Sequence, residues 1–255
     1  MTERETVHLD ATGSEWLEPP WPVAFELAGL LPHRSWTLVG GLMVSLHARL
    51  AGLPQPRTTT DVDSALHLET GVVSFAQAAA VLQSAGFSLN EETKFAYQFE
   101  RNIGDELQPD KVDVLCADRY VAKNKPAYLG RPLFGVAGGT RALKETINVE
   151  LKTEDGTVSL VIPSVRGALV LKGAAYLEDQ RERMRHAEDA VLLLACLTDT
   201  DHVLSGLSSE SRKRVTAIAT VLNGSTLPWV NHSQLVQSLA REALEALVET
   251  LNFKG

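Results

Sequence analysis

The sequence is poor in cysteine, in long apolar runs and in positive charge. Cys116 and Cys196 are its two cysteines among 255 residues, and neither has the spacing of a metal ligand. Such cysteines in apolar surroundings are usually reduced core residues. No apolar run approaches the ~20 residues that a membrane-spanning helix needs, and the polar N-terminus lacks the apolar core of a signal peptide. We therefore expect a cytoplasmic protein without a membrane partner.

The charge balance excludes a basic surface over the whole protein. The formal net charge is −8, which favours solubility and gives no global footprint for nucleic acid. A local basic groove stays possible. Hydrophobic residues make up 44% of the chain, enough for a sizeable core. A chain of this length can hold one large domain or two modest ones.

The pattern of apolar residues changes near residue 163. Before it, helix-like and strand-like segments are mixed; after it, nearly every segment is helix-like. Residues 1–20 look like a loose lead-in, and we expect loops with at most short strands in residues 119–146. We expect helices at 21–31, 42–51, 74–86, 165–177, 183–197, 208–223 and 233–251, and strands at 37–39, 58–68, 87–89, 95–101, 111–116, 148–151 and 157–162. The class is α+β: a mixed sheet with flanking helices in residues 1–162, followed by a helical C-terminal domain in residues 163–255.

Two aspartates one residue apart, Asp61 and Asp63, stand on a strand-like segment. Side chains alternate along a strand, so both carboxylates point to one face. A solvated strand end or a cap for the next turn would need no more than this pair. Asp113 adds a third carboxylate on another, otherwise apolar strand, where a charge needs an explanation. Three carboxylates on neighbouring strands can hold two Mg²⁺ ions, because Mg²⁺ prefers oxygen ligands.

A glycine pair, Gly40-Gly41, lies between the strand at 37–39 and the next helix. Backbone N–H groups at the start of a helix have no partner inside it and attract anions. A carboxylate pair beside an anion-binding turn suits a metal-bound nucleotide phosphate.

These motifs resemble the polymerase-beta-type nucleotidyltransferase superfamily. The resemblance is carried by Gly40-Gly41 and its helix, by Arg57-x-x-x-Asp61-x-Asp63, and by Lys111-Val-Asp113-Val-Leu. Within the superfamily, the motifs resemble the AbiEii-type branch more closely. This branch contains nucleotidyltransferase toxins of abortive-infection and toxin–antitoxin systems. Pro163, Lys172, the basic run 181–186 and Asp189 stand where that branch has its later motifs. The resemblance covers roughly residues 36–195.

The resemblance implies a nucleotidyltransferase fold, Mg²⁺ and an NTP substrate. It places metal ligands at Asp61, Asp63 and Asp113, and in the toxin branch a carboxylate in the place of Asp189 is needed for activity. The residues expected to bind the triphosphate are Gly40, Gly41, Arg57, Thr58 and Lys172. The chain departs from the pattern in its long loop at 52–56, in its second turn glycine, and in His186, which stands where an aspartate is common.

The later residues also have plainer interpretations. Lys172 could be a surface lysine whose stem lies on apolar neighbours. The run of Arg181, Arg183 and Arg185 could be a solvated helix face or a local patch for phosphate or RNA. Asp189 could form a simple helix ion pair with Arg185 or His186.

We expect a Mg²⁺-dependent transfer of a nucleoside monophosphate from an NTP to an acceptor hydroxyl, at a site between the two domains. Candidate acceptors are a tRNA 3′ end and a protein side chain, and a cognate antitoxin is a candidate partner. A small-molecule, aminoglycoside-type nucleotidyltransferase is a second enzymatic interpretation. A non-catalytic nucleotide-binding, antitoxin or scaffold module of the same fold is the interpretation from another class.

Overall fold

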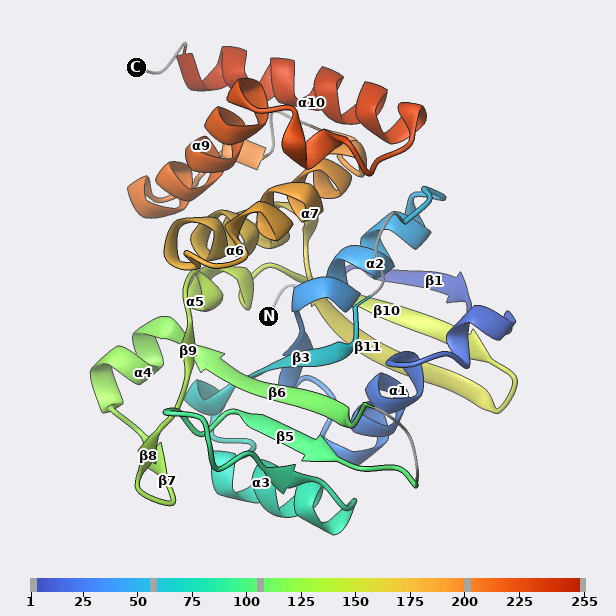
Figure 1. Ribbon diagram of the computed structural model, residues 1–255, viewed down its shortest axis with the longest axis vertical. Coiled ribbons are helices and arrows are strands. Elements are labelled where there is room, and N and C mark those ends of the chain that lie inside the picture. Colours follow the sequence, from blue (N-terminus) through green and yellow to red (C-terminus); the bar gives the residue numbers. More distant parts are fainter. Residues whose placement is uncertain (1–3, 56–58, 105–107, 200–202, 253–255) are drawn as a thin grey trace. The chain divides into compact units, whose positions relative to one another are not determined.

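The computed structural model describes residues 4–55, 59–104, 108–199 and 203–252. These divide into two compact units (Figure 1). The first unit is drawn from Met1–Leu42 and Thr59–Pro163, and the second from Met43–Thr58 and Ser164–Gly255. The domain division at residue 163 stays a prediction.

The main sheet of the first unit has a parallel pair at its centre. The strands follow one another in the order β2 (Trp36–Leu38), β3 (Asp61–Leu66), β6 (Asp110–Ala117), β5 (Gln98–Arg101) and β4 (Ser88–Leu89), and β9 (Gly135–Val136) also pairs with β6. β3 and β6 run parallel, whereas β2–β3, β6–β5 and β5–β4 are antiparallel. Figure 1 shows β3, β6 and β5 side by side. Val62, Phe99 and Val112 are fully buried on one face, which leaves the alternate residues for the other face.

The second sheet of this unit corrects one expectation. β10 (Thr146–Thr153) and β11 (Gly156–Pro163) contain the strands expected at 148–151 and 157–162, and they pair as an antiparallel hairpin. β1 (Thr6–Asp10) pairs in parallel with β10, so residues 1–20 are not merely a loose lead-in. The side chains of β1 are exposed or half-buried. Val7 and Leu9 alternate with polar neighbours, but the pattern is only five residues long and none of its side chains is fully buried. Backbone pairing with β10 holds the segment in place.

The helices of the first unit are partly as expected. They are α1 (Trp21–Leu30), the start of α2 (Gly40–Leu50), α3 (Phe75–Ser84), α4 (Asp118–Asn124) and α5 (Gly139–Ala142), with single turns η1 (Ser14–Trp16) and η2 (Leu68–Thr70). The Ser74 side chain caps α3 by accepting from the Gln77 backbone N–H, as its sequence signature predicts.

The expectation of loops with at most short strands at 119–146 was wrong in part, because the helices α4 and α5 lie there. The short pair β7 (Ala127–Tyr128) and β8 (Arg131–Pro132) agrees with it. The Asp118 carboxylate organises this region. It accepts hydrogen bonds from the backbone N–H groups of Gly138 (2.9 Å) and Thr140 (3.1 Å), and from the Thr140 hydroxyl. These contacts join residues about twenty positions apart, which local sequence patterns do not reveal.

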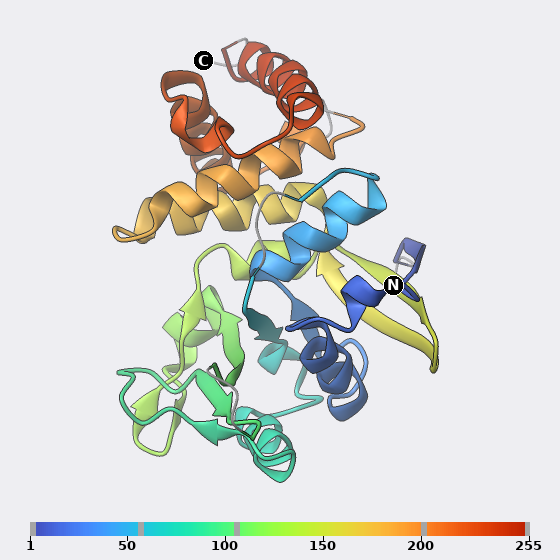
Figure 2. The same ribbon diagram turned by 45° about the vertical axis from the view of Figure 1, so that its right-hand side comes forward.

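The second unit is helical, as expected. Its main helices α6 (Val165–Glu178), α7 (Arg183–Ala195), α9 (Ser209–Gly224) and α10 (Gln234–Asn252) pack against one another, with the turn η3 (Leu227–Trp229) against α7 (Figure 2). A Cβ atom at Gly173 in α6 would overlap the backbone oxygen of Arg214 in α9. The two helices therefore approach so closely that only glycine fits there.

The expected α+β class is thus confirmed, with a mixed sheet and flanking helices before a helical part. Of the described helices, none is both long enough and apolar enough to cross a membrane. Cys116 and Cys196 are free thiols, the first buried and the second half-buried.

One arginine holds several elements of the first unit together. The Arg101 guanidinium in β5 makes a bidentate pair with the Glu26 carboxylate of α1, at 2.7 and 2.9 Å. It also donates to Asp110 of β6 at 2.9 Å and to the Ala85 carbonyl after α3 at 2.9 Å, and it lies 4.2 Å above the Phe87 ring. Charge-assisted, bidentate contacts of this kind are the strong ones in proteins.

We expect Glu26→Gln to lower the free energy of unfolding by about 1–2 kcal/mol, because Arg101 loses its bidentate partner. Glu100→Gln is the matched control. Glu100 lies 3.9 Å from Lys111, and both of these side chains are about one third exposed, so its loss should cost less than about 0.5 kcal/mol. Urea denaturation of both variants measures the difference. Equal costs would show that the Arg101 contacts do not stabilise the unit.

Candidate metal and nucleotide site

The three sequence-predicted aspartates lie on the central parallel strand pair. In the register of β3 and β6, Asp63 stands beside Asp113, and Asp61 stands beside Lys111. Residues side by side in a sheet project to the same face, and residues two apart share it. The sheet therefore brings Asp61, Asp63 and Asp113 to one face, as the sequence predicts. All three are half-buried.

A glycine turn lies directly against these carboxylates. β2 ends at Leu38, the Val39 N–H donates to the Asp63 carbonyl at 2.9 Å, and α2 begins at Gly40. Gly40 has φ of +69°, and a Cβ atom there would overlap the Asp63 carboxylate. A Cβ atom at Gly41 would lie 2.8 Å from the Thr59 side chain. Both glycines are thus needed for close approach, and the first also for its left-handed backbone.

Burial and the neighbouring carboxylates raise the proton affinity of Asp113. Burial, and then the nearby Asp63 and Asp61 carboxylates, raise the pKa of Asp113 to about 8, against smaller opposing effects of Gln98 and Lys111. The Asp113 Oδ1 atom is buried and has no hydrogen-bond partner. A half-buried carboxylate among like charges is costly when ionised, so a cation is the ligand chemistry that this face favours.

Tyr97 and Gln98 join the site, and the sequence analysis did not single them out. Burial, then Asp113, Asp63 and Asp61, raise the pKa of the Tyr97 phenol, which places its ring near all three carboxylates. Gln98 stands beside Asp113 in the antiparallel β5–β6 pair. The strand-like run 95–101 was visible in the sequence, but its register against β6 was not.

The carboxylates of Asp61, Asp63 and Asp113 are chemically suited to bind Mg²⁺. Their positions, however, do not yet form a complete metal site. Carboxylate oxygens are the preferred Mg²⁺ ligands, and Mg²⁺ sites commonly use one or two carboxylates together with waters and substrate phosphates. The orphaned Asp113 oxygen fits a cation, and the turn at Gly40 holds the Asp63 carboxylate against the start of α2. Among the described residues, however, no three His, Cys, Asp or Glu side chains converge on a metal position as they stand.

Two predicted residues lie in the second unit and bind each other. The Lys172 Nζ of α6 lies 2.7 Å from the Asp189 Oδ2 of α7, and both side chains are at most 10% exposed. Lys172 is therefore not a surface lysine, and Asp189 does not need Arg185 or His186 as its partner. His186 instead lies 3.2 Å from Asp179. The structure brings Lys172 and Asp189 together as a buried ion pair, and their catalytic roles stay predictions.

The remaining predicted residues fall elsewhere. Arg57 and Thr58 lie outside the described residues. Arg181 and Arg185 are exposed, and Arg185 pairs with Glu182 in the same helical stretch. The guanidinium of Arg183 lies 4.3 Å above the Tyr176 ring. The basic run 181–186 is therefore not a uniform solvated face.

Comparison with known proteins bears on the fold. No protein-family model and no curated protein matches this sequence. The crystal structure of an antigenic nucleotidyltransferase-like protein from Paracoccidioides brasiliensis is similar, with a TM-score of 0.51 and 18% sequence identity. The likeness covers 88% of this chain and 91% of that one. The chain thus has a nucleotidyltransferase-like fold, the one that the sequence motifs implied.

Gly40→Ala tests the close approach of the turn to Asp63. We expect it to lower the free energy of unfolding by more than the roughly 1–2 kcal/mol that a left-handed alanine costs, because the new methyl group overlaps the carboxylate. Gly71→Ala is the matched control, since Gly71 also has φ of +69° and would place its Cβ atom in open space. Urea denaturation of both variants compares the costs. Equal values would show that the close contact between Gly40 and Asp63 adds nothing to the cost of the alanine.

Asp113→Asn tests the raised pKa through stability. In the metal-free protein the folded state retains a proton that the unfolded chain releases near pH 4, so stability falls as the pH rises from about 4 toward about 8. The variant lacks this loss. We expect it to melt above the wild type at pH 8, by roughly 2–4 °C for each kcal/mol, and to show a smaller gain at pH 5.

Scanning calorimetry in EDTA measures both melting temperatures at each pH. Asp155→Asn, in the exposed turn between β10 and β11, is the control and should show no such dependence. A gain for Asp113→Asn that is the same at both pH values would contradict the raised pKa.

Proposed function

We propose that the chain is a Mg²⁺-dependent nucleotidyltransferase. The observation that carries the proposal is the shared face of Asp61, Asp63 and Asp113, set against the glycine turn at Gly40. The nucleotidyltransferase-like fold supports the same class. Neither feature alone would suffice, because folds host many functions and the site must carry the chemistry.

Each residue of this face has a role in the proposal. Asp61 and Asp63 hold the metal with their carboxylate oxygens, and the Asp113 oxygen that has no hydrogen-bond partner completes the donor set. When bound, up to two Mg²⁺ ions supply the positive charge that offsets the triphosphate and the leaving pyrophosphate. The backbone N–H groups at the start of α2 would donate to phosphate oxygens, and Gly40 allows the Asp63 carboxylate to lie directly beside them.

The transfer exchanges one phosphorus–oxygen bond for another. The acceptor hydroxyl oxygen forms a bond with the α-phosphorus of the NTP, the bond from that phosphorus to the bridging oxygen breaks, and pyrophosphate leaves. The Asp113 carboxylate accepts the proton of the attacking hydroxyl. The family resemblance implies functional roles for Lys172 and Asp189, and the proposal includes both residues as contributors to the transfer.

The acceptor follows from the AbiEii-type resemblance rather than from a contact. We propose an RNA 3′ end such as that of tRNA, or a protein side chain, as the acceptor, and a toxin role with a cognate antitoxin. A small-molecule acceptor of the aminoglycoside type is the second enzymatic option. The alternative from another class is a non-catalytic module that only binds nucleotide. It needs a direct test, because among the described residues no three potential ligands converge on a metal position.

Asp63→Asn separates these possibilities. Titration calorimetry with a non-hydrolysable NTP measures binding, and incubation with α-³²P-labelled NTPs and bulk tRNA measures transfer. We expect Mg²⁺-dependent binding by the wild type, and a loss of transfer of at least about 100-fold in the variant, because the metal loses a direct ligand. Asp155→Asn, an exposed turn variant, should behave like the wild type.

The outcomes distinguish the classes. Binding without transfer to tRNA, protein or an aminoglycoside would support the non-catalytic module. Equal Mg²⁺-dependent NTP binding by Asp63→Asn and the wild type would contradict the whole assignment. Growth arrest on expression that Asp63→Asn relieves would support the toxin role.

A further inference from the structure

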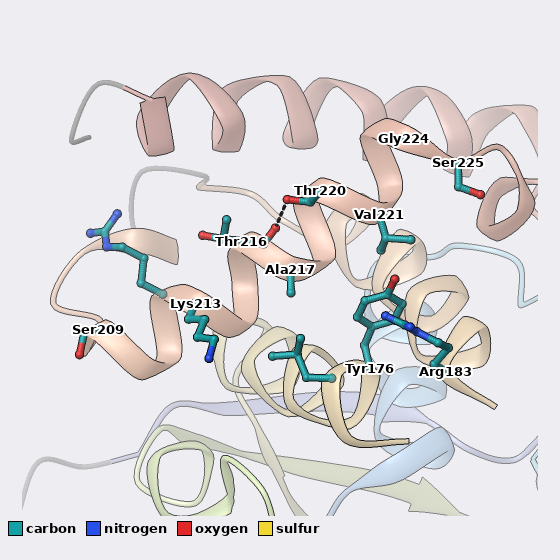
Figure 3. A pocket seen from close by; sticks show the side chains of 12 residues that line it. Tyr176, Arg183, Ser209, Lys213, Thr216, Ala217, Thr220, Val221, Gly224 and Ser225 are labelled. Carbon is teal, nitrogen blue, oxygen red and sulfur yellow. Dashed lines mark hydrogen bonds between the residues drawn. The ribbon is translucent and has the colours of Figure 1, made fainter. Parts of the chain in front are cut away.

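The helical unit contains a cavity of about 780 Å³ that the proposed transfer does not use. It lies between the last turn of α6, the start of α7 and one side of α9, and we call it the helical cavity. Figure 3 shows Lys213 and Ala217 on the side of α9 that faces Tyr176 and Arg183. Its size is that of ordinary small-molecule sites.

The lining of the helical cavity is positively charged, whereas the chain as a whole has a negative net charge. Arg183, Arg212 and Lys213 line the cavity, and none of the described lining residues carries a carboxylate. Within the described part of the chain, none of the three cations has an acidic side chain at ion-pair distance. In a protein of net charge −8, such a local excess of positive charge favours an anionic ligand.

Two of these cations have buried nitrogens without partners. The Arg183 Nε and the Arg212 Nη1 atoms are buried and form no hydrogen bond. Their positions are nevertheless fixed, because the Arg183 guanidinium stacks on Tyr176 at 4.3 Å and the Arg212 Nη2 reaches the Leu204 carbonyl at 3.5 Å. Buried charged groups are normally paired, so these two lack the acceptors that phosphate oxygens would supply.

The rest of the wall is suited to a flat apolar group. Leu177, Ala217 and Val221 line the cavity, together with the methyl-bearing side chains of Thr216 and Thr220. An inorganic phosphate would leave this wall in contact with water. A ligand with a phosphate at one end and an aromatic base at the other would use both parts of the lining, since bases lie well on apolar, aromatic and guanidinium surfaces.

We propose that the helical cavity binds a nucleoside phosphate, with the phosphate on Arg183, Arg212 and Lys213 and the base on the wall of Leu177, Ala217 and Val221. The ligand is either a free nucleotide or one nucleotide of a single-stranded nucleic acid. This binding needs no metal, because the protein supplies the cations. It is also independent of Asp61, Asp63 and Asp113, so either proposal can fail without the other.

The test titrates the full-length Asp63→Asn protein in EDTA, which removes metal-dependent binding at the aspartates. The probes are AMP, a single-stranded tetranucleotide and inorganic phosphate. We expect AMP or the tetranucleotide to bind, and Arg183→Gln/Lys213→Gln in this background to weaken the binding at least about tenfold through the lost charge-assisted contacts. Lys123→Gln/Lys144→Gln is the matched control.

The control removes two exposed lysines from a different basic cavity, of about 420 Å³ in the first unit, which also contains Glu69. Ala217→Trp is a second variant that fills the helical cavity and leaves its charge unchanged; it too should weaken binding. Circular dichroism confirms that each variant is folded, and if the double variant is not, Ala217→Trp alone decides.

The probes separate the two sources. Tighter binding of the tetranucleotide than of AMP, with a stronger dependence on salt, indicates a nucleic acid; equal or tighter binding of AMP indicates a free nucleotide. The proposal is overturned if neither AMP nor the tetranucleotide binds, if phosphate binds as tightly as the tighter of these two probes, or if the control variant weakens binding as much as the cavity variants do.

Discussion

The placement of Asp63 beside Asp113 on two parallel strands is the constraint on which the candidate site depends. Like charges at adjacent positions of a sheet destabilise it, and partial burial increases the cost. The fold meets this cost in the metal-free state by holding a proton on Asp113, whose pKa is raised to about 8. A bound cation would replace that proton, and the same strain would then favour metal binding.

The close approach of the glycine turn follows from the same row of strands. β2 pairs with β3, so the chain leaves the sheet beside Asp63 and enters α2 at once. No side chain fits between the turn and the carboxylate, as the overlap at Gly40 shows. A helix N-terminus and a carboxylate are thereby held next to each other, the first attracting phosphate and the second attracting a cation.

The sequence was sufficient for the parts of this arrangement that depend on spacing. The alternation around Asp61 and Asp63 predicted their common face, and the apolar strand around Asp113 predicted its neighbourhood. The register between β5 and β6 could not be predicted from the sequence. Tyr97 and Gln98 reach the site through this antiparallel pairing, which no local pattern encodes. β1 was missed because its alternation of Val7 and Leu9 with polar residues is only five residues long, and its pairing with the distant β10 holds it as a strand.

The pairing of charged side chains was the hardest property to predict. Composition gives the number of charges, whereas only the folded structure determines which of them form pairs. Lys172 and Asp189 neutralise each other in a buried pair, so whatever each contributes to a ligand is weakened by the other. Arg183 resembles its neighbours Arg181 and Arg185 in sequence, yet it alone of the three lines a cavity without a carboxylate. A net charge of −8 therefore says little about anion binding. The deciding quantity is how many cations at one place lack an acidic partner, and in the helical cavity Arg183, Arg212 and Lys213 line one space without a carboxylate among the described lining residues.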